Sequence, residues 1–303
     1  MALFDRRHAH SRRRAEPHID CTQKYTQPWS QRRKEMSNII GVSIPFATPK
    51  RAEALTAAAH EAGFTLEFFE YGAVTQEQLD RCEVFFGMAP PAMLGAAANL
   101  KWFQSSFAGV DVYVRVPKFA QGDAVLTNAS GAYGITISEH MVVALLMLLR
   151  KMPAYYEMQQ RKEWGYAGEI KSIYGSTITV VGTGDIGSNF GARVKAMGAT
   201  VRGVRRNAAV KPAFCDEIYA DTQLLDAISG ADVVALSVPG TDLTRKFFGE
   251  PELAAMKKDA VLMNVGRGSA IDLDALDHAL RTGAIGGAAL DVTDPEPFPA
   301  EHP

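Results

Sequence analysis

Short runs of β-branched and other apolar residues alternate with segments of helical spacing along most of the chain, most clearly over residues 177–207. An apolar run containing Ile178 and Val181 is broken by glycines. An alanine-rich segment with apolar residues at helical spacing follows, and then a second β-type run at 199–204. This order predicts a strand, a turn, a helix and a second strand, which together form a βαβ unit.

The same alternation continues on both sides of this unit, and elements of this length predict parallel sheets with helices on both faces. Before the unit, the pattern predicts strands at residues 39–44, 64–69, 83–87, 100–105 and 124–127, and helices at residues 50–62 and from Thr75, where Gln78 completes a capping box. After the unit, it predicts strands at residues 217–219, 232–238, 260–265 and 285–290, and helices at residues 222–229, 251–256 and 272–282. The second half of the chain should therefore form a doubly wound sheet of roughly six strands.

One helix has a different pattern. Thr136 and Glu139 form a capping-box sequence, and nine consecutive apolar residues follow from Met141 to Leu149. Such a run cannot form a single apolar stripe, so we expect this helix to be buried nearly all round, between two domains or in a subunit interface.

The glycines of the βαβ unit carry the first candidate chemistry. Residues 182–187 read Gly-Thr-Gly-Asp-Ile-Gly, a GxGxxG sequence between a strand and a helix. Gly182 permits a tight turn, Gly184 lets the backbone approach a pyrophosphate, and Gly187 lets helix and strand pack closely. With Asp185 and Ile186 opening the helix, this motif predicts a dinucleotide site. The alternative is a glycine-rich structural turn.

The end of the second strand bears on the choice of cofactor. NAD sites place Asp or Glu there to bind the ribose 2′-hydroxyl, whereas this chain has Arg205, Arg206 and Asn207. Guanidinium groups match a 2′-phosphate in charge and geometry, so we expect NADP(H) to be preferred, with NAD(H) possible. The alternative is two solvated arginines beside a site that does not distinguish the two cofactors.

Composition excludes several functional classes. The chain is 47% hydrophobic and 22% charged, with a net charge of −2, typical of an ordinary soluble globular protein long enough for two domains. Residues 1–35 hold nine Lys or Arg and four Asp or Glu, a charge of +5 that leaves −7 for the rest. General nucleic-acid or membrane binding is therefore not expected. We interpret residues 1–37 as a disordered basic tail, with an RNA-binding arm or a mitochondrial presequence as less favoured alternatives.

The cysteines and the longest apolar run bear on the compartment. Three cysteines without CxxC spacing predict neither a disulfide framework nor a zinc site, and we expect no metal. The longest apolar run is about half the length needed to span a membrane. We therefore expect a cytoplasmic protein.

Three further segments together resemble the D-isomer-specific 2-hydroxyacid dehydrogenase family. Residues 102–111 (WFQSSFAGVD) are similar to its substrate loop, residues 264–268 (NVGRG) to its arginine motif, and residues 290–297 (LDVTDPEP) to its glutamate motif. The glycine motif lies between them in the family's order. The resemblance implies a flavodoxin-like substrate domain at residues 38–133 and a Rossmann-type NAD(P) domain at residues 134–296. It also implies that the protein is a homodimer.

The resemblance also assigns roles. The amides of Ala108 and Gly109 would hold the substrate carboxylate, and Arg267 would bind carboxylate and ketone oxygen together. Its position just after a buried strand agrees, because ligands bind at the carboxyl ends of parallel strands. Glu296 would support a catalytic histidine, and the remaining cofactor contacts would come from Val238, Pro239, Thr241, Val265 and Asp291. Without the resemblance, Arg267 is equally well a sheet-edge residue and Glu296 a solvated turn residue.

The family's catalytic histidine lies on a strand beyond the glutamate motif, whereas Pro303 comes only seven residues after Glu296. His302 is too near Glu296 in sequence to take that place, and His60, His140 and His278 lie on predicted helices without following a strand end. We expect residues 297–303 to begin a truncated return segment and turnover to be impaired.

The resulting hypothesis is an NADP(H)-preferring enzyme that reduces a small 2-oxo acid, such as glyoxylate or hydroxypyruvate, to the D-2-hydroxy acid. A phosphoglycerate-type dehydrogenase and a non-catalytic dinucleotide-binding protein remain as alternatives.

Overall fold

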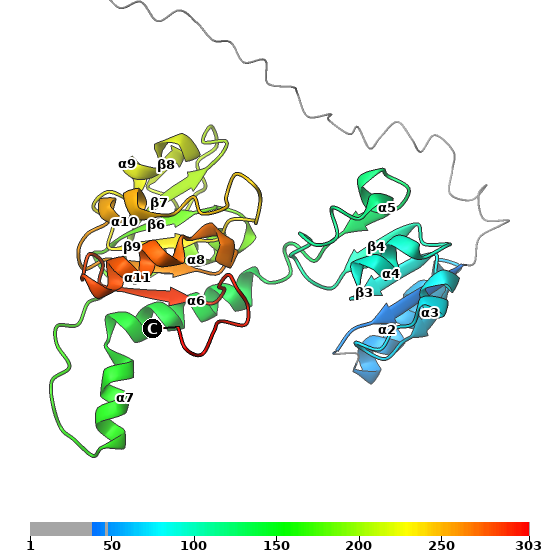
Figure 1. The fold of residues 1–303 in the computed structure, drawn as a ribbon, viewed down its shortest axis with the longest axis horizontal. Coiled ribbons are helices and arrows are strands. Elements are labelled where there is room, and N and C mark those ends of the chain that lie inside the picture. Colours follow the sequence, from blue (N-terminus) through cyan, green and yellow to red (C-terminus); the bar gives the residue numbers. More distant parts are fainter. Residues whose placement is uncertain (1–37, 46–47, 303) are drawn as a thin grey trace, which may run out of the picture.

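The computed structural model describes residues 38–45 and 48–302, which form two α/β lobes joined by the segment before helix α6 (Figure 1). The expected basic tail at 1–37 lies outside these residues. None of the helices in the described ranges is long and apolar enough to cross a membrane.

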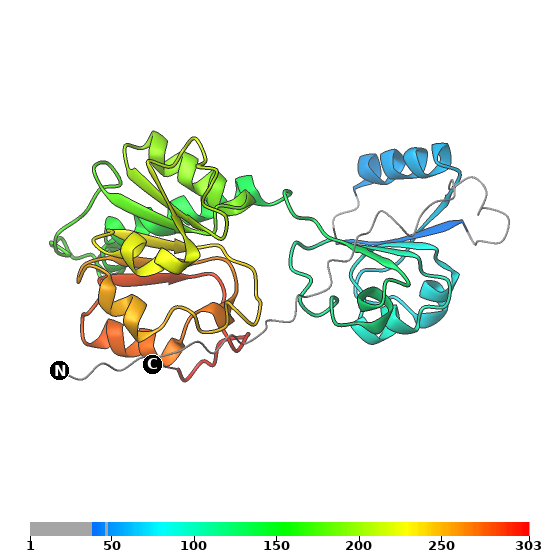
Figure 2. The ribbon, with the colours of Figure 1, turned by 90° about the horizontal axis from the view of Figure 1, so that it is seen from above.

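The first lobe is a five-stranded parallel sheet in the order β2-β1-β3-β4-β5, the flavodoxin-like order. Its strands are β1 (Ile39–Ser43), β2 (Thr65–Phe68), β3 (Val84–Gly87), β4 (Trp102–Ser105) and β5 (Val125–Thr127). The helices are α2 (Pro49–Glu61), α3 (Gln76–Arg81), α4 (Pro91–Ala96) and α5 (Pro117–Ala120). Figure 2 shows α2 on one side of this sheet and the other helices on the opposite side.

Local signals explain several boundaries in this lobe. The predicted capping box of α3 is confirmed: the Gln78 amide donates to the Thr75 hydroxyl, and Gln78 Oε1 accepts from the Thr75 amide at 2.9 Å. Helix α2 has Thr48 as its N-cap and ends before Gly63, whose φ of 79° follows the αL termination expected of glycine. The short helices α4 and α5 were not predicted, because each begins at a proline and spans only one turn or so.

The second lobe is a six-stranded parallel sheet in the order β11-β10-β9-β6-β7-β8, the Rossmann order. Its strands are β6 (Thr177–Val181), β7 (Thr200–Arg205), β8 (Glu217–Ala220), β9 (Val233–Leu236), β10 (Val261–Asn264) and β11 (Gly287–Leu290). Its helices and 3₁₀ turns are α6 (Gly134–Leu149), α7 (Met152–Gln160), α8 (Asp185–Ala196), η2 (Asp221–Gln223), α9 (Leu224–Ile228), α10 (Glu250–Ala255), η3 (Gly268–Ala270) and α11 (Leu273–Arg281). The prediction of two doubly wound parallel-sheet domains is confirmed.

Every residue of β9 and β10 is buried, because helices cover both faces of the sheet centre. On one face, Phe190 and Val194 of α8 pack with Met141 and Leu145 of α6. Continuous apolar strands of this kind are typical of parallel sheets.

Helix α6 differs from its prediction in two respects. It begins at Gly134 with Tyr133 as N-cap and no side-chain cap, so the capping box at Thr136 is wrong. Only one face is buried, against α8 and the sheet, while Val143 and Met147 are 56% and 44% exposed. Within the single chain the helix is therefore not buried nearly all round, and its burial in a subunit interface stays a prediction.

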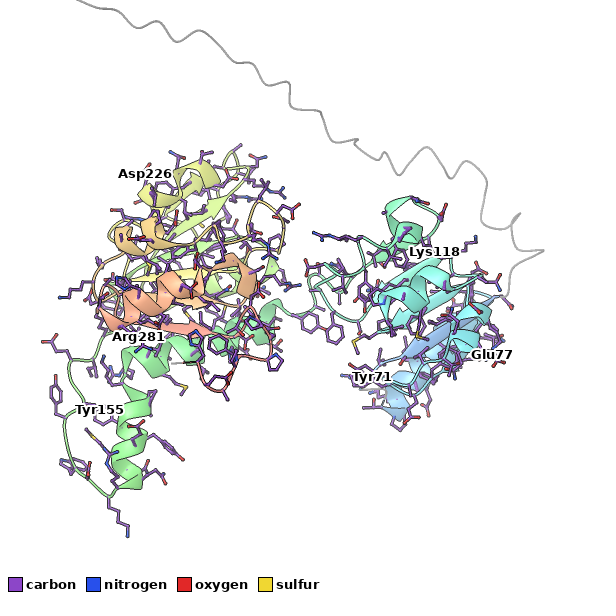
Figure 3. The ribbon with its side chains drawn as sticks, viewed as in Figure 1. Tyr71, Glu77, Lys118, Tyr155, Asp226 and Arg281 are labelled. Carbon is purple, nitrogen blue, oxygen red and sulfur yellow. The ribbon has the colours of Figure 1, made fainter. Side chains whose placement is uncertain are left out.

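Helix α7 was not predicted, because its sequence lacks an apolar period strong enough to signal a helix. It follows Lys151, whose φ of 55° turns the chain sharply after α6. The helix projects away from the second sheet, as the position of Tyr155 in Figure 3 shows.

Candidate active site

The glycine turn between β6 and α8 has the geometry expected of a dinucleotide site. Gly182 has a φ of 94°, a conformation that side chains disfavour. A Cβ on Gly187 would lie 2.0 Å from the Gly182 carbonyl oxygen, so this glycine is required for close packing. A Cβ on Gly184 would meet no atom within 4 Å, which leaves open space beside the backbone.

The N-terminus of α8 faces this space. Gly184 is the N-cap, and no side chain caps the helix, so its first amides remain available to an anion together with the helix dipole. Nearby, Thr183 Oγ is buried without a partner in the described part of the chain. A turn with room for backbone approach, uncapped amides and an orphaned hydroxyl fits the diphosphate of a dinucleotide. Asp185 and Ile186 lie in the first turn of the same helix.

The end of β7 carries the predicted cofactor-selecting residues. Arg205 is the last residue of the strand, and its Nη1 donates to the Val210 carbonyl at 3.4 Å. Arg206 is exposed, and Asn207 Oδ1 accepts from the Ala209 amide. Residues 205–211, at and after the end of β7, include no acidic residue that could accept from a ribose hydroxyl.

The ends of β9 and β10 meet the glycine turn. A Cβ on Gly182 would lie 3.1 Å from Val238 Cγ1, and one on Gly266 would lie 2.5 Å from the Val238 carbonyl oxygen. The Val265 amide donates to Leu236, which keeps the two strand ends in register. Thr241 forms a turn with Thr244, whose hydroxyl also donates to the Pro239 carbonyl. The structure therefore brings Val238 to the glycine turn, whereas Val265 lies one strand further along, paired with Leu236.

Arg267 lies beside Gly109 of the first lobe, and this is the closest approach of the predicted substrate residues. A Cβ on Gly109 would stand 1.8 Å from Arg267 Nη2. Arg267 Nε donates to Asp111 Oδ2 at 2.8 Å, and Nη1 donates to the Gly266 carbonyl. The guanidinium is thus held from both lobes, with Nη2 next to the substrate loop.

Asn264 fixes the backbone that carries Arg267. It is fully buried at the end of β10, its Nδ2 donates to the Arg267 carbonyl at 2.9 Å, and its Oδ1 accepts from the Gly266 amide. Asn264 belongs to the arginine motif, but the motif predicts no role for it. The sequence signal for this role was a polar residue at the end of an otherwise apolar strand.

Asp291 has a neighbour that sequence reasoning missed. Its amide donates to the Asn264 carbonyl, and its Oδ1 lies 3.4 Å from Nε2 of His140 on α6. Both side chains are about half exposed, at 48% and 57%. The apolar pattern of α6 concealed this contact, because nothing in the local sequence relates His140 to the end of β11.

Glu296 lies in the exposed segment after β11. Its Oε1 accepts from the Thr293 amide at 2.9 Å, which closes a turn. The His302 ring lies against Phe298, with ring centroids 4.4 Å apart and the ring planes tilted by 40°. Among the described residues, no histidine has a recorded contact with Glu296 or Arg267.

The described residues contain no cluster of His, Cys, Asp and Glu that could hold a metal ion. Cys82 and Cys215 are buried and unpaired, and burial raises the pKa of each thiol to about 11. Neither thiol is therefore a nucleophile at neutral pH.

Comparison with known proteins gives a consistent result. Residues 142–303 match the model of the D-isomer specific 2-hydroxyacid dehydrogenase NAD-binding domain. The glycerate dehydrogenase of Methylorubrum extorquens is 30% identical over 263 residues, covering 81% of this chain and 80% of that protein.

Solved structures agree. A D-isomer specific 2-hydroxyacid dehydrogenase family protein from Aeromonas salmonicida has a TM-score of 0.73 at 31% identity, covering 88% of this chain and 84% of that one. The dehydrogenase of Xanthobacter autotrophicus, in complex with NADPH and MES, shares the fold with a TM-score of 0.72 at 24% identity, covering 88% and 84%. The chain belongs to the D-isomer-specific 2-hydroxyacid dehydrogenase family, whose members are NAD(P)-dependent enzymes.

Proposed function

We propose that this protein reduces a small 2-oxo acid of the glyoxylate or hydroxypyruvate type to the D-2-hydroxy acid, with NADPH as the preferred hydride donor. The observation that carries the proposal is the position of Arg267 against Gly109, with the glycine turn of β6–α8 on the same edge of the second sheet. This arrangement supplies donors for an anionic substrate next to the expected dinucleotide.

Each residue then has a chemical task. The amides of Ala108 and Gly109 bind the substrate carboxylate. Arg267 binds a carboxylate oxygen and the ketone oxygen, and its charge stabilises the alkoxide that develops at the ketone. Asp291 accepts from the nicotinamide carboxamide, and Glu296 stands at the position whose carboxylate would support a catalytic histidine, which the described residues do not place beside it.

Turnover by this chain tests the proposal directly. We expect NADPH oxidation with glyoxylate and hydroxypyruvate, at rates well below those usual for such enzymes, because no described histidine faces Arg267 and a general acid contributes about 10²–10⁴-fold. The measurement is the loss of NADPH absorbance with a panel of 2-oxo acids. Full, enzyme-like rates would contradict the expected impairment, and dinucleotide binding without any turnover would favour a non-catalytic binding protein.

Cofactor preference rests on the end of β7. We expect Arg205→Asp to weaken NADPH binding by about tenfold or more, since charge-assisted hydrogen bonds are worth about 1.5–3 kcal/mol. NADH binding to the same variant is the internal control and should hold or improve, because the new carboxylate can accept from the 2′-hydroxyl. An unchanged ratio of the two dissociation constants would remove the 2′-phosphate argument.

We further propose a cytoplasmic homodimer. The exposed apolar side chains of α6 and α7 support self-association, since Val143, Met152 and Tyr156 are 56%, 50% and 62% exposed on one continuous part of the chain. Sedimentation at micromolar concentration tests this, and a monomer at all concentrations would contradict it.

A further inference from the structure

The segment that joins the two lobes makes an unusual set of contacts with the substrate loop. Three successive carbonyls of the loop are bonded to it: Ser106 accepts from the Tyr133 hydroxyl at 2.6 Å, Phe107 from the Ala129 amide at 3.1 Å, and Ala108 from Asn128 Nδ2 at 2.7 Å. We call residues 128–133 the connector. All three bonds lie between the end of β5 and the start of α6.

These bonds fix the direction of the loop amides. A trans peptide unit is planar, and its C=O and N–H point to opposite sides. Because the connector holds the carbonyls of Ser106, Phe107 and Ala108, the amides of the same three peptide units point away from it. The Phe107 amide donates to Ser105 Oγ at 3.1 Å, whereas the Ala108 and Gly109 amides donate to no group in the described ranges.

Asn128 is itself held in one orientation. Its Oδ1 accepts from the Ser130 amide at 3.3 Å, while its Nδ2 donates to Ala108. Only this placement of Oδ1 and Nδ2 satisfies both contacts, because the Nδ2 amino group must face an acceptor and Oδ1 must face a donor. The side chain is therefore a fixed donor to the peptide unit that carries the Gly109 amide.

We propose that the connector is the positioning element of the substrate-carboxylate site, with Asn128 as the residue that directs the Gly109 amide toward the anion. This inference rests on the proposed function, which assigns the carboxylate to the Ala108 and Gly109 amides. The connector also determines how the two lobes are joined, so the carboxylate site and the lobe connection share one structural support.

Oxalate, a stable two-carbon dianion that resembles a 2-oxo acid, is the probe. Its dissociation constant is measured by calorimetry on the full chain saturated with NADPH. The side chain of Asn128→Asp has the same shape and keeps an acceptor for the Ser130 amide, but it loses the donor to Ala108. We expect oxalate binding to weaken by about tenfold, because one half-buried donor is lost and a carboxylate faces a carbonyl.

Two further variants complete the test. Tyr133→Phe removes the hydroxyl that donates to Ser106 and should weaken oxalate binding by about threefold; it carries the test if Asn128→Asp does not fold. Ser130→Ala keeps the backbone amide and should leave the oxalate dissociation constant within about twofold. NADPH binding should be unchanged in all three variants. A general disturbance of the fold would weaken NADPH binding as well as oxalate binding.

The outcomes separate the two ideas. Failure of the unaltered chain to bind oxalate in the presence of NADPH would overturn the proposed function. Normal oxalate binding by the unaltered chain, by Asn128→Asp and by Tyr133→Phe would leave that function standing and overturn the role of the connector.

Discussion

The two proposed anion sites of this molecule are built in opposite ways. On the nucleotide side, the turn at 182–187 is shaped by the absence of side chains, and Gly187 packs against the Gly182 carbonyl just after the end of β6. On the substrate side, the loop at 106–109 is half-buried apart from the exposed Phe107, and it is held by hydrogen bonds from the connector, with the Arg267 guanidinium beside Gly109.

The difference shows how each site responds to change. Close packing admits almost no substitution, because a single added methyl meets backbone atoms that cannot move independently. Hydrogen bonds from side chains are worth about 1 kcal/mol each, so a site built on them is altered in small steps. A single substitution in the nucleotide site should therefore abolish binding, whereas single substitutions in the substrate site should weaken binding in small steps.

The largest effect is expected for Gly187→Ala. Its Cβ would lie 2.0 Å from the Gly182 oxygen, so helix α8 must shift from β6. Overpacking of this kind costs about 1–3 kcal/mol, and the shifted helix should lose NADPH altogether. Calorimetry and thermal unfolding measure both consequences.

Gly184→Ala is the matched control, because it adds the same methyl group to another glycine of the same turn. Its Cβ meets nothing within 4 Å, so the free energy of unfolding should be unchanged while NADPH binding weakens through contact with the diphosphate. Equal stability of the two variants would contradict the packing role of Gly187.

The next effect is expected for Arg267→Ala. Loss of its charge-assisted bonds should weaken oxalate binding to the NADPH complex by about 10–100-fold. Arg115→Ala is the control, since Arg115 also reaches across to the second lobe, at 3.7 Å from Asp242, but is 83% exposed. Similar losses in both variants would indicate a general effect of positive charge instead of a specific contact.

The smallest effect is expected at Asp216, remote from both sites. Lys195 donates to its carboxylate, as does the Val201 amide, and these bonds lower the pKa of Asp216 below its usual value. Asp216→Asn should cost about 1 kcal/mol or less at pH 7, because the pair is more than one-third exposed.

The sign of the pH dependence follows from that shift. A lowered folded-state pKa stabilises the protein above the unfolded value, and the stabilisation is lost as the pH falls through the folded one. The difference in unfolding free energy between Asp216→Asn and the unaltered chain should therefore shrink below about pH 4. A difference that stays constant with pH would contradict the ion-pair account.

Periodicity and glycine spacing were sufficient to predict the two sheets, because parallel strands buried on both faces leave strong apolar runs such as 261–264. The one-turn helices and the exposed half of α6 were not predictable, since their boundaries depend on prolines and on neighbours that the local pattern does not contain. The same holds for the site. Arg267 was identified from its motif, but its contact with Asp111 joins residues 156 positions apart, and the pairing of His140 with Asp291 joins two elements that no local pattern relates.

The first residue of α6 adds a further constraint. A Cβ on Gly134 would lie 2.3 Å from Asp185 Oδ1, so the residue that follows the connector abuts the opening turn of α8. The segment from Asn128 to Gly134 thus contacts the substrate loop at one end and the first turn of α8 at the other. Many enzymes tolerate changes in loop length. An insertion or deletion between Asn128 and Gly134, however, would displace the proposed NADPH site and the proposed substrate-carboxylate site together. Differences in substrate specificity are therefore expected to come from other parts of the two lobes.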